Sequence, residues 1–135
     1  MLPLSSAVMI KAYGIIPIQG KKVLIVHHVN GGHWGFPKGR GEAGETPLES
    51  ATRELFEETG LRIVKILSPE PLIEERTNKL IYFFPALVEG TLSFQAEEIL
   101  EGQWVSLEEL VEKLTYPEAK IVGEKIMRLF LPSMR

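Results

Sequence analysis

Residues 37–61 read PKGRGEAGETPLESATRELFEETGL, a loop with three glycines followed by a stretch that carries the signals of a helix. Thr46 can cap that helix, and Pro47 suits its first turn. Glu49 completes a capping box with Thr46, and Gly60 can end the helix. At about 100° of rotation per residue, one side of this helix carries four charged side chains within an arc of roughly 140°: Arg53, Glu54, Glu57 and Glu58.

Folding alone does not favour the clustered glutamates on this helix, because like charges at helical spacing repel by roughly a few tenths of a kcal/mol per pair. An isolated acidic face is ordinarily just solvated. Here the carboxylates follow a glycine loop, and Mg²⁺ is a hard cation that takes carboxylate, water and phosphate oxygens. Leu48, Ala51 and Leu55 share another face, which can pack on a sheet. The stretch therefore favours a magnesium site on the outward face.

The composition is typical of one globular domain, expected over residues 1–135, with 44% apolar and 24% charged residues. The sequence contains no cysteine, which excludes a disulfide framework and a thiolate zinc site, so a cytoplasmic setting is expected. We expect neither targeting nor membrane insertion, because no run approaches the ~18 apolar residues that span a bilayer. The net charge of −3 gives no general attraction to long nucleic acid or anionic lipid.

The rest of the chain predicts a mixed sheet with helices packed against it. Alternating or continuous apolar runs predict strands at 12–18, 22–29, 62–67, 71–77, 79–90 and 102–106. Pro85 predicts an edge position or a bulge within the run 79–90. Ser106 and Glu109 begin a second, short helix. Pro117 begins a third helix, whose apolar stripe is expected to hold Ile121, Val122, Ile126, Leu129 and Phe130.

Seven fixed positions in this stretch resemble the Nudix box. They are Gly39, then Glu45 after five residues, then Arg53 after seven more, followed by Glu54, Glu57, Glu58 and Gly60 within the run RELFEETGL that ends at Leu61. The resemblance implies the Nudix fold, an α/β/α sandwich with a mixed sheet. It also implies hydrolysis of a nucleoside diphosphate linked to another group, with a divalent metal.

The resemblance also assigns roles to the residues of the box. Glu54, Glu57 and Glu58 match the glutamates that bind metal and supply the base in the family. The carbonyl of Lys38 matches a frequent backbone ligand. Arg53 lies one turn before Glu57, and its guanidinium can pair with a carboxylate and orient it.

The base that accepts a proton from the attacking water has two candidates. Glu54 is one, and Glu98 in the AEEILEGQW stretch is the other, since Nudix enzymes often bring a glutamate from a later loop to the metal. Glu97 could replace Glu98. The implied cofactor is Mg²⁺, with Mn²⁺ as a substitute.

Features outside the box resemble the Nudix subgroup of asymmetrically cleaving diadenosine tetraphosphate hydrolases. They are the lead-in WGFPKG at 34–39, a tyrosine at Tyr82, and Glu98 six residues before Trp104. In that reading His33, Lys38 and Lys79 contact phosphates, and Tyr82 stacks on a base. The plain alternatives are that both lysines and His33 are solvated and that Tyr82 belongs to the core.

The expected reaction is hydrolysis of diadenosine tetraphosphate to ATP and AMP, with a small dinucleoside polyphosphate as the partner. Removal of pyrophosphate from RNA 5′ ends is the alternative reaction, which the absence of a basic stripe disfavours. A nucleotide-binding sensor without turnover is a third possibility, which the complete set of three box glutamates disfavours. No motif encodes the oligomeric state.

Overall fold

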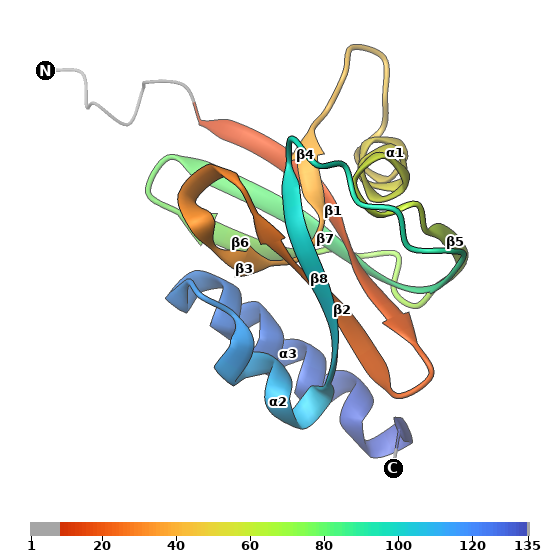
Figure 1. The fold of residues 1–135 in the computed structure, drawn as a ribbon. Helices are drawn as coiled ribbons and strands as arrows, with labels where there is room; N and C mark the ends of the chain where they lie inside the picture. Colours follow the sequence, from red (N-terminus) through yellow and green to blue (C-terminus); the bar gives the residue numbers. More distant parts are fainter. Residues whose placement is uncertain (1–8, 135) are drawn as a thin grey trace, which may run out of the picture.

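A computed structural model describes residues 9–134, with side chains described as far as residue 132. The chain forms one sheet of eight strands in which β3, β2, β1, β7 and β5 lie side by side in this order (Figure 1). Strand β4 pairs with β1, β6 with β7, and β8 with β2. The strands are β1 (Ile10–Gln19), β2 (Lys22–His28), β3 (Trp34–Gly35), β4 (Lys38–Arg40), β5 (Arg62–Ile66), β6 (Leu72–Arg76), β7 (Lys79–Glu89) and β8 (Ile99–Ser106).

The sheet is mixed, as predicted. Its centre is the parallel pair of β1 and β7, which runs from Ile10 opposite Lys79 to Ile18 opposite Leu87. All other strand pairs in the sheet formed by residues 9–134 are antiparallel. The parallel pair therefore joins two antiparallel halves, one built on β2 and β8 and the other on β5 and β6.

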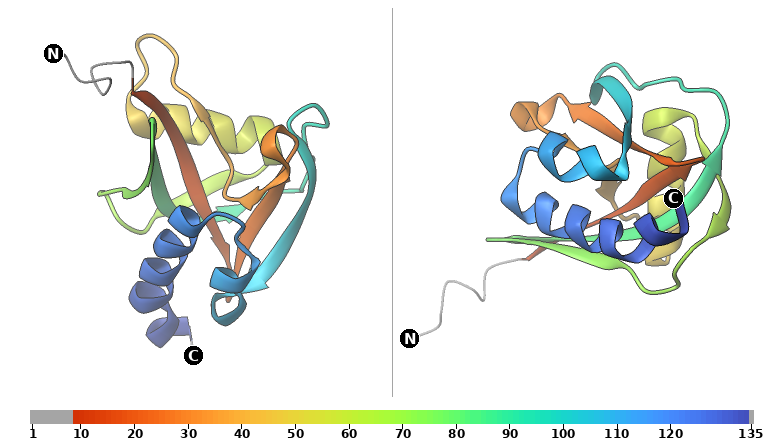
Figure 2. Two further views of the ribbon diagram at one scale, coloured as in Figure 1. Left: turned by 90° about the vertical axis from the view of Figure 1, so that its left-hand side faces the viewer. Right: turned by 90° about the horizontal axis from the view of Figure 1, so that it is seen from below.

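Helices cover both faces of the sheet, which confirms the α/β/α sandwich. Helix α1 (Pro47–Thr59) lies on one face, while α2 (Leu107–Lys113) and α3 (Pro117–Met134) lie on the other (Figures 1 and 2). Both predicted capping boxes form, Thr46 with Glu49 and Ser106 with Glu109. None of the helices within residues 9–134 is long and apolar enough to cross a bilayer.

Two apolar clusters fill the space between the helices and the sheet. On the α1 side, Ala51 and Leu55 are fully buried against strand residues that include Ile15 and Leu24. The other cluster joins α2 and α3 to the opposite face of the sheet. Burial of Leu55 stabilises the fold by roughly 2 kcal/mol or more. It also sets the rotation of α1, so that Glu54 and Glu58 lie beside β4.

Two local predictions were wrong. Strand β7 is central rather than an edge, because it pairs with β1 on one side and with β6 and β5 on the other. It has no bulge at Pro85 either, because its register with β1 continues through that residue. Pro85 lies where this second partner changes, after Phe83 opposite β6 and before Ala86 opposite β5, and its carbonyl accepts a bond from the N–H of Leu67. The loop at 37–46 also contains a strand, β4, which pairs with β1.

The apolar stripe of α3 also differs from the prediction. Ile121 is 53% exposed and Leu129 is 59% exposed. The predicted Val122 and Ile126 are buried, and Phe130 packs against the same cluster. The buried line also includes Ala119, so it runs at steps of three and four residues. Ile121 precedes a buried residue of this line by one position, so it is rotated by about 100° away from the core.

Candidate functional site

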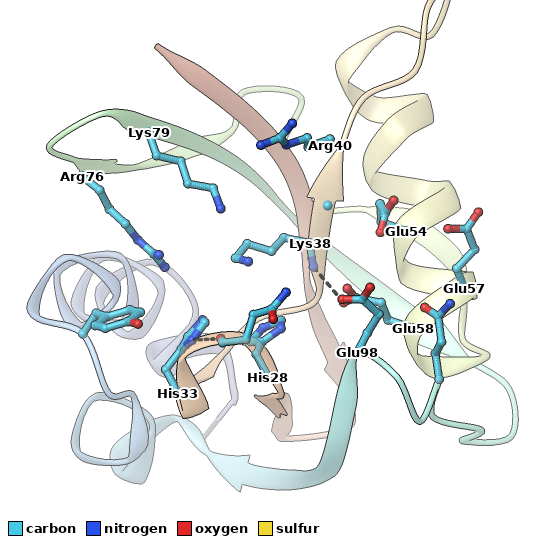
Figure 3. A pocket seen from close by; sticks show the side chains of 14 residues that line it. His28, His33, Lys38, Arg40, Glu54, Glu57, Glu58, Arg76, Lys79 and Glu98 are labelled. Carbon is cyan, nitrogen blue, oxygen red and sulfur yellow. Dashed lines mark hydrogen bonds between the residues drawn. The ribbon is translucent and has the colours of Figure 1, made fainter. Parts of the chain in front are cut away.

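A cavity of about 470 Å³ opens between α1 and the turn that joins β6 to β7 (Figure 3). Its two sides have opposite charge. Carboxylates lie on the α1 side, and cations lie on the side of the β6–β7 turn, as Figure 3 shows. The acidic lining residues are Glu54, Glu57, Glu58 and Glu98; the others are His28, Asn30, His33, Lys38, Gly39, Arg40, Arg76, Lys79, Gln95 and Tyr116.

Arg53 holds the carboxylates of α1 in place. Its Nη1 lies 2.8 Å from Glu54 Oε1 and 3.1 Å from Glu57 Oε2. Its Nη2 donates to the carbonyl of Arg40 at 2.9 Å, which ties the helix to β4. The planar guanidinium can serve several acceptors at once, so it orients neighbouring carboxylates and reduces their repulsion.

Glu45 supports Arg53 from the loop before α1. Its carboxylate accepts from Arg53 Nε at 2.8 Å, from the Ser50 hydroxyl at 2.7 Å and from the backbone N–H of Glu42 at 2.8 Å. The bonds from Arg53 are the main cause that lowers the pKa of Glu45 to about 2. Glu45 lies outside the lining of this cavity, and its carboxylate contacts Arg53 directly.

Glu58 is the buried member of the acidic side, with 4% exposure. Its Oε1 accepts a hydrogen bond from the backbone N–H of Lys38 at 3.1 Å (Figure 3). Burial, with repulsion from Glu54 and Glu98, raises the pKa of Glu58 to about 8 against this bond. The charge of Lys38 also favours the ionised form of Glu58, but burial outweighs it.

Glu54 lies directly over Gly39 in β4. A Cβ atom at position 39 would overlap the Glu54 carboxylate, so the close approach of helix and strand requires glycine there. Burial is the largest cause that raises the pKa of Glu54, and its bond with Arg53 opposes the shift. Gly39 therefore makes room for this carboxylate at the cavity.

Glu98 reaches the cavity from the turn that precedes β8. Its N–H donates to the carbonyl of Gln95, and its own carbonyl accepts from Val29 at the end of β2, both at 2.9 Å. The N–H of Gln95 in turn donates to the carbonyl of Glu58. The turn is thus fastened to α1 and β2, and it is Glu98 rather than Glu97 that lines the cavity.

The cationic side brings together four side chains: Lys38, Arg40, Arg76 and Lys79. Burial, and next the charge of Lys79, lower the pKa of Lys38 to about 8. Burial, and then the charges of Arg76 and Arg40, also lower the pKa of Lys79. These cations are close enough to repel one another, so an anion in the cavity would stabilise all of them.

Two histidines lie between the charged sides, with stacked rings 4.6 Å apart. His28 Nε2 lies 3.0 Å from the carbonyl of Phe36, and His33 Nδ1 lies 3.1 Å from that of Asn30, so each of these nitrogens carries the hydrogen. Burial is the main cause that lowers the pKa of His28 to about 3 and that of His33 to about 4. His33 Nε2 is buried and has no hydrogen-bond partner among the described residues.

Tyr82 does not join the other expected substrate residues. It stacks on Tyr13, with ring centroids 5.6 Å apart, and is absent from the cavity lining. Lys79 lies three positions earlier on β7, and successive side chains of a strand point to opposite faces. The aromatic residue at the cavity is Tyr116, in the connection between α2 and α3, whose ring centroid lies 4.6 Å from that of His33.

Sequence reasoning missed six lining residues: His28, Asn30, Arg40, Arg76, Gln95 and Tyr116. Arg76 carried a usable signal, because it stands at a strand end only three positions before Lys79, and a turn brings both cations to one edge. Tyr116 carried none, since its place depends on how α2 and α3 pack on the sheet.

The acidic side fits a hard divalent cation by its chemistry. The side chains of Glu54, Glu57, Glu58 and Glu98 offer oxygen atoms alone. Burial, and after it repulsion between neighbouring glutamates, raises the pKa of Glu54 and of Glu58, and a bound cation would favour the ionised form of both. Within the described part of the chain, no three His, Cys, Asp or Glu side chains are gathered closely enough to enclose an ion. Water and ligand phosphates would therefore have to complete the coordination, as is usual for Mg²⁺.

The model of the NUDIX domain matches residues 9–129. An RNA pyrophosphohydrolase of Bartonella tribocorum is 41% identical over 78 residues, 55% of this chain and 42% of that protein. An 8-oxo-(d)GTP phosphatase of Mycolicibacterium smegmatis is 26% identical over 116 residues, 82% of this chain and 34% of that protein. The chain thus spans less than half the length of these curated relatives.

A solved structure shares the fold almost throughout. The Ap4A hydrolase of C. elegans, determined as a binary complex, aligns with a TM-score of 0.74 and 23% identity, covering 91% of this chain and 98% of that one. Its similarity shows the arrangement of strands and helices. With the domain match from residue 9 to residue 129 and the complete box on α1 and the loop before it, this chain belongs to the Nudix family.

Proposed function

We propose that this protein is a divalent-metal-dependent pyrophosphohydrolase that cleaves diadenosine tetraphosphate asymmetrically to ATP and AMP. The observation that carries the proposal is the division of one cavity into a carboxylate side and a cationic side. A chain of phosphates needs cations along its length, and carboxylates near the reacting phosphorus are suited to hold metal and water.

The metal would be held by the carboxylates of Glu54, Glu57, Glu58 and Glu98 and by the carbonyl of Lys38. Members of the family generally use divalent ions such as Mg²⁺, and Mn²⁺ is the expected substitute. When bound, such an ion neutralises phosphate oxygens and lowers the pKa of water. The hydrogen bond from the Lys38 N–H to the Glu58 carboxylate holds that carboxylate next to the backbone of Lys38.

The chain's own residues divide the remaining work. Lys38 and Lys79 bind phosphate oxygens, and Arg53 keeps Glu54 and Glu57 oriented. Glu54 or Glu98 accepts the proton of the attacking water. The water oxygen bonds to the phosphorus of one terminal adenylate, the bond from that phosphorus to the bridging oxygen breaks, and ATP leaves.

Product analysis in oxygen-18 water tests this proposal. Diadenosine tetraphosphate with Mg²⁺ should yield ATP and AMP, with the label in AMP, because water attacks the adenylate phosphorus. Formation of two ADP molecules would exclude asymmetric cleavage. Label found mainly in ATP would place the attack on the other side of the bridging oxygen.

Pyrophosphate removal from RNA 5′ ends is the second candidate. The relative from Bartonella tribocorum that bears this activity in its name is 41% identical in the aligned segment. A triphosphate end would also match the cationic side of the cavity. RNA with a 5′-triphosphate and 8-oxo-dGTP should therefore be assayed beside the dinucleotide at equal concentration. Faster pyrophosphate release from RNA than cleavage of the dinucleotide would make RNA the substrate.

A further inference from the structure

Arg76 occupies a fixed position at the end of the cavity remote from α1. Its Nε lies 2.6 Å from Oε2 of Glu74, a carboxylate that is only 2% exposed. Its guanidinium carbon lies 4.5 Å from the centroid of the Tyr116 ring, a cation–π distance. Figure 3 shows the side chain reaching from the end of β6 into the cavity. A buried carboxylate and an aromatic ring therefore orient this cation.

The contacts leave much of the guanidinium available. Within residues 9–134 the side chain of Arg76 forms its hydrogen bond to Glu74 through Nε, and no bond from either Nη joins it to another described residue. Arginine carries five N–H donors, so four stay available on the Nη groups. A guanidinium fixed in this way loses little freedom when it binds two oxygens of one phosphate.

The positions of the other cations indicate the path of a phosphate chain. Lys38 interacts both with Glu58, on the acidic side, and with Arg76 and Lys79. Its side chain therefore lies between the acidic side and the far end, as Figure 3 also shows. A ligand whose phosphate meets the carboxylates would pass Lys38 before it reaches Arg76, so only a longer chain of phosphates can use every cation.

We propose that Arg76, oriented by Glu74 and Tyr116, binds the phosphate group most distant from the attacked phosphorus, so that this end of the cavity selects ligands by the length of their phosphate chain. The proposal rests on the proposed function only in placing the attacked phosphorus beside α1. In this scheme Arg76 contacts the ligand, and Glu74 is a positioning residue that acts through Arg76.

Binding of inorganic phosphates tests the proposal without catalysis. Orthophosphate, pyrophosphate and tripolyphosphate are titrated calorimetrically into the metal-free protein in the presence of EDTA. We expect affinity to increase with chain length. Arg76→Gln should weaken tripolyphosphate binding by about tenfold or more, because charge-assisted hydrogen bonds are lost, and it should weaken orthophosphate binding less.

Arg62→Gln is the matched control. The guanidinium carbon of Arg62 also lies over an aromatic ring, 5.1 Å from the centroid of Phe56, but Arg62 is absent from the lining of this cavity. Arg62→Gln removes the same charge and the same type of contact as Arg76→Gln. Because Arg62 lies outside the cavity lining, this variant should leave the affinities for all three phosphates unchanged. An equal loss in both variants would reduce the role of Arg76 to net charge and overturn the proposal.

The role of Glu74 is tested by a double-mutant cycle. Glu74→Gln should weaken tripolyphosphate binding in the wild-type background and have no further effect in Arg76→Gln. The double variant also avoids leaving a buried carboxylate unpaired, so it keeps the comparison possible if Arg76→Gln alone folds poorly. An independent effect of Glu74→Gln would exclude positioning through Arg76.

The outcomes separate this proposal from the proposed function. If the protein hydrolyses no dinucleotide but binds tripolyphosphate through Arg76, the proposed function is refuted and the inference about Arg76 is supported. If the wild-type protein cleaves diadenosine tetraphosphate and Arg76→Gln binds all three phosphates as tightly as the wild type, the proposed function is supported and the inference about Arg76 is refuted.

Discussion

The backbone N–H of Lys38 donates to the carboxylate of Glu58 at 3.1 Å, and this bond joins the glycine loop to the acidic helix. Among residues 9–134, no other group donates a hydrogen bond to the Glu58 carboxylate. Burial outweighs this one bond, so the pKa of Glu58 is raised to about 8. A metal ligand must be deprotonated, so if Glu58 binds the metal as proposed, metal binding should release a proton below that pH.

Glu58→Gln should abolish Mg²⁺-dependent hydrolysis and leave nucleotide binding in EDTA nearly unchanged. The substitution keeps the size of the side chain and removes its negative charge. Hydrolysis and calorimetric nucleotide binding should be measured on the same preparation. If the wild-type protein binds nucleotides but turns over none, a sensor function replaces catalysis.

The same residue predicts a pH effect on stability in EDTA. Below pH 4.5 Glu58 is protonated in both the folded and the unfolded state, and between 4.5 and about 8 only the folded state keeps the proton. The free energy of unfolding therefore falls as the pH rises through this window, by at most about 1.4 kcal/mol per unit. Chemical denaturation should show a smaller decline for Glu58→Gln. Identical slopes for both proteins would show that Glu58 ionises freely.

His28 predicts a pH effect of the opposite sign. Its pKa is lowered from 6.5 to about 3, so below pH 6.5 the unfolded state takes up a proton that the folded state refuses. The free energy of unfolding should fall as the pH drops from 6.5 towards 3, by at most about 1.4 kcal/mol per unit. In denaturation series between pH 7 and 4, His28→Gln should be less sensitive to acid than the wild type.

Arg53→Lys should lower kcat by about tenfold or more, because a single ammonium group cannot replace the bonds to Glu45, Glu54 and Glu57 together. Arg128→Lys is the control, since Arg128 is exposed and lies 3.7 Å from Glu124 in an ordinary pair one turn apart. Steady-state kinetics with diadenosine tetraphosphate compares them. Equal activity in the two variants would contradict a role for Arg53 in orienting the carboxylates.

The two tyrosines give a test of ligand recognition. Tyr116→Leu should raise KM for a dinucleoside polyphosphate several-fold, because it removes the ring under Arg76 and beside His33. Tyr82→Leu should change stability more than KM, because Tyr82 packs on Tyr13 away from the cavity. Thermal unfolding and steady-state kinetics of both variants check this, and a larger KM effect at Tyr82 would restore it as a base platform.

Local signals predicted which carboxylates lie together along α1. The capping box at Thr46 and Glu49 fixes the start of α1, and the helical repeat then sets the relative directions of the charged residues that follow it. These relations involve neighbours in the sequence, so they need no knowledge of the tertiary structure. The fold class followed from the same stretch through the box, and the sheet and both helical layers confirm it.

The cationic side was less predictable, because it depends on contacts between distant segments. Lys79 and Tyr82 were expected to contact the same ligand. In a strand, however, side chains three positions apart point to opposite faces of the sheet. Arg76 and Tyr116 meet only because α3 packs beside β6. The exposure of Ile121 likewise follows from the angle at which α3 lies on the sheet, which its apolar pattern alone does not specify.

The parallel pairing of β1 with β7 also has a consequence for the order of folding. The glycine loop and the acidic helix follow the β1–β2 hairpin in the chain, while Arg76 and Lys79 belong to the β6–β7 hairpin. The two charged sides face each other only after these distant segments have paired, a slow step because a long loop must close. In a stopped-flow refolding experiment, recovery of phosphate binding should therefore lag behind the formation of secondary structure.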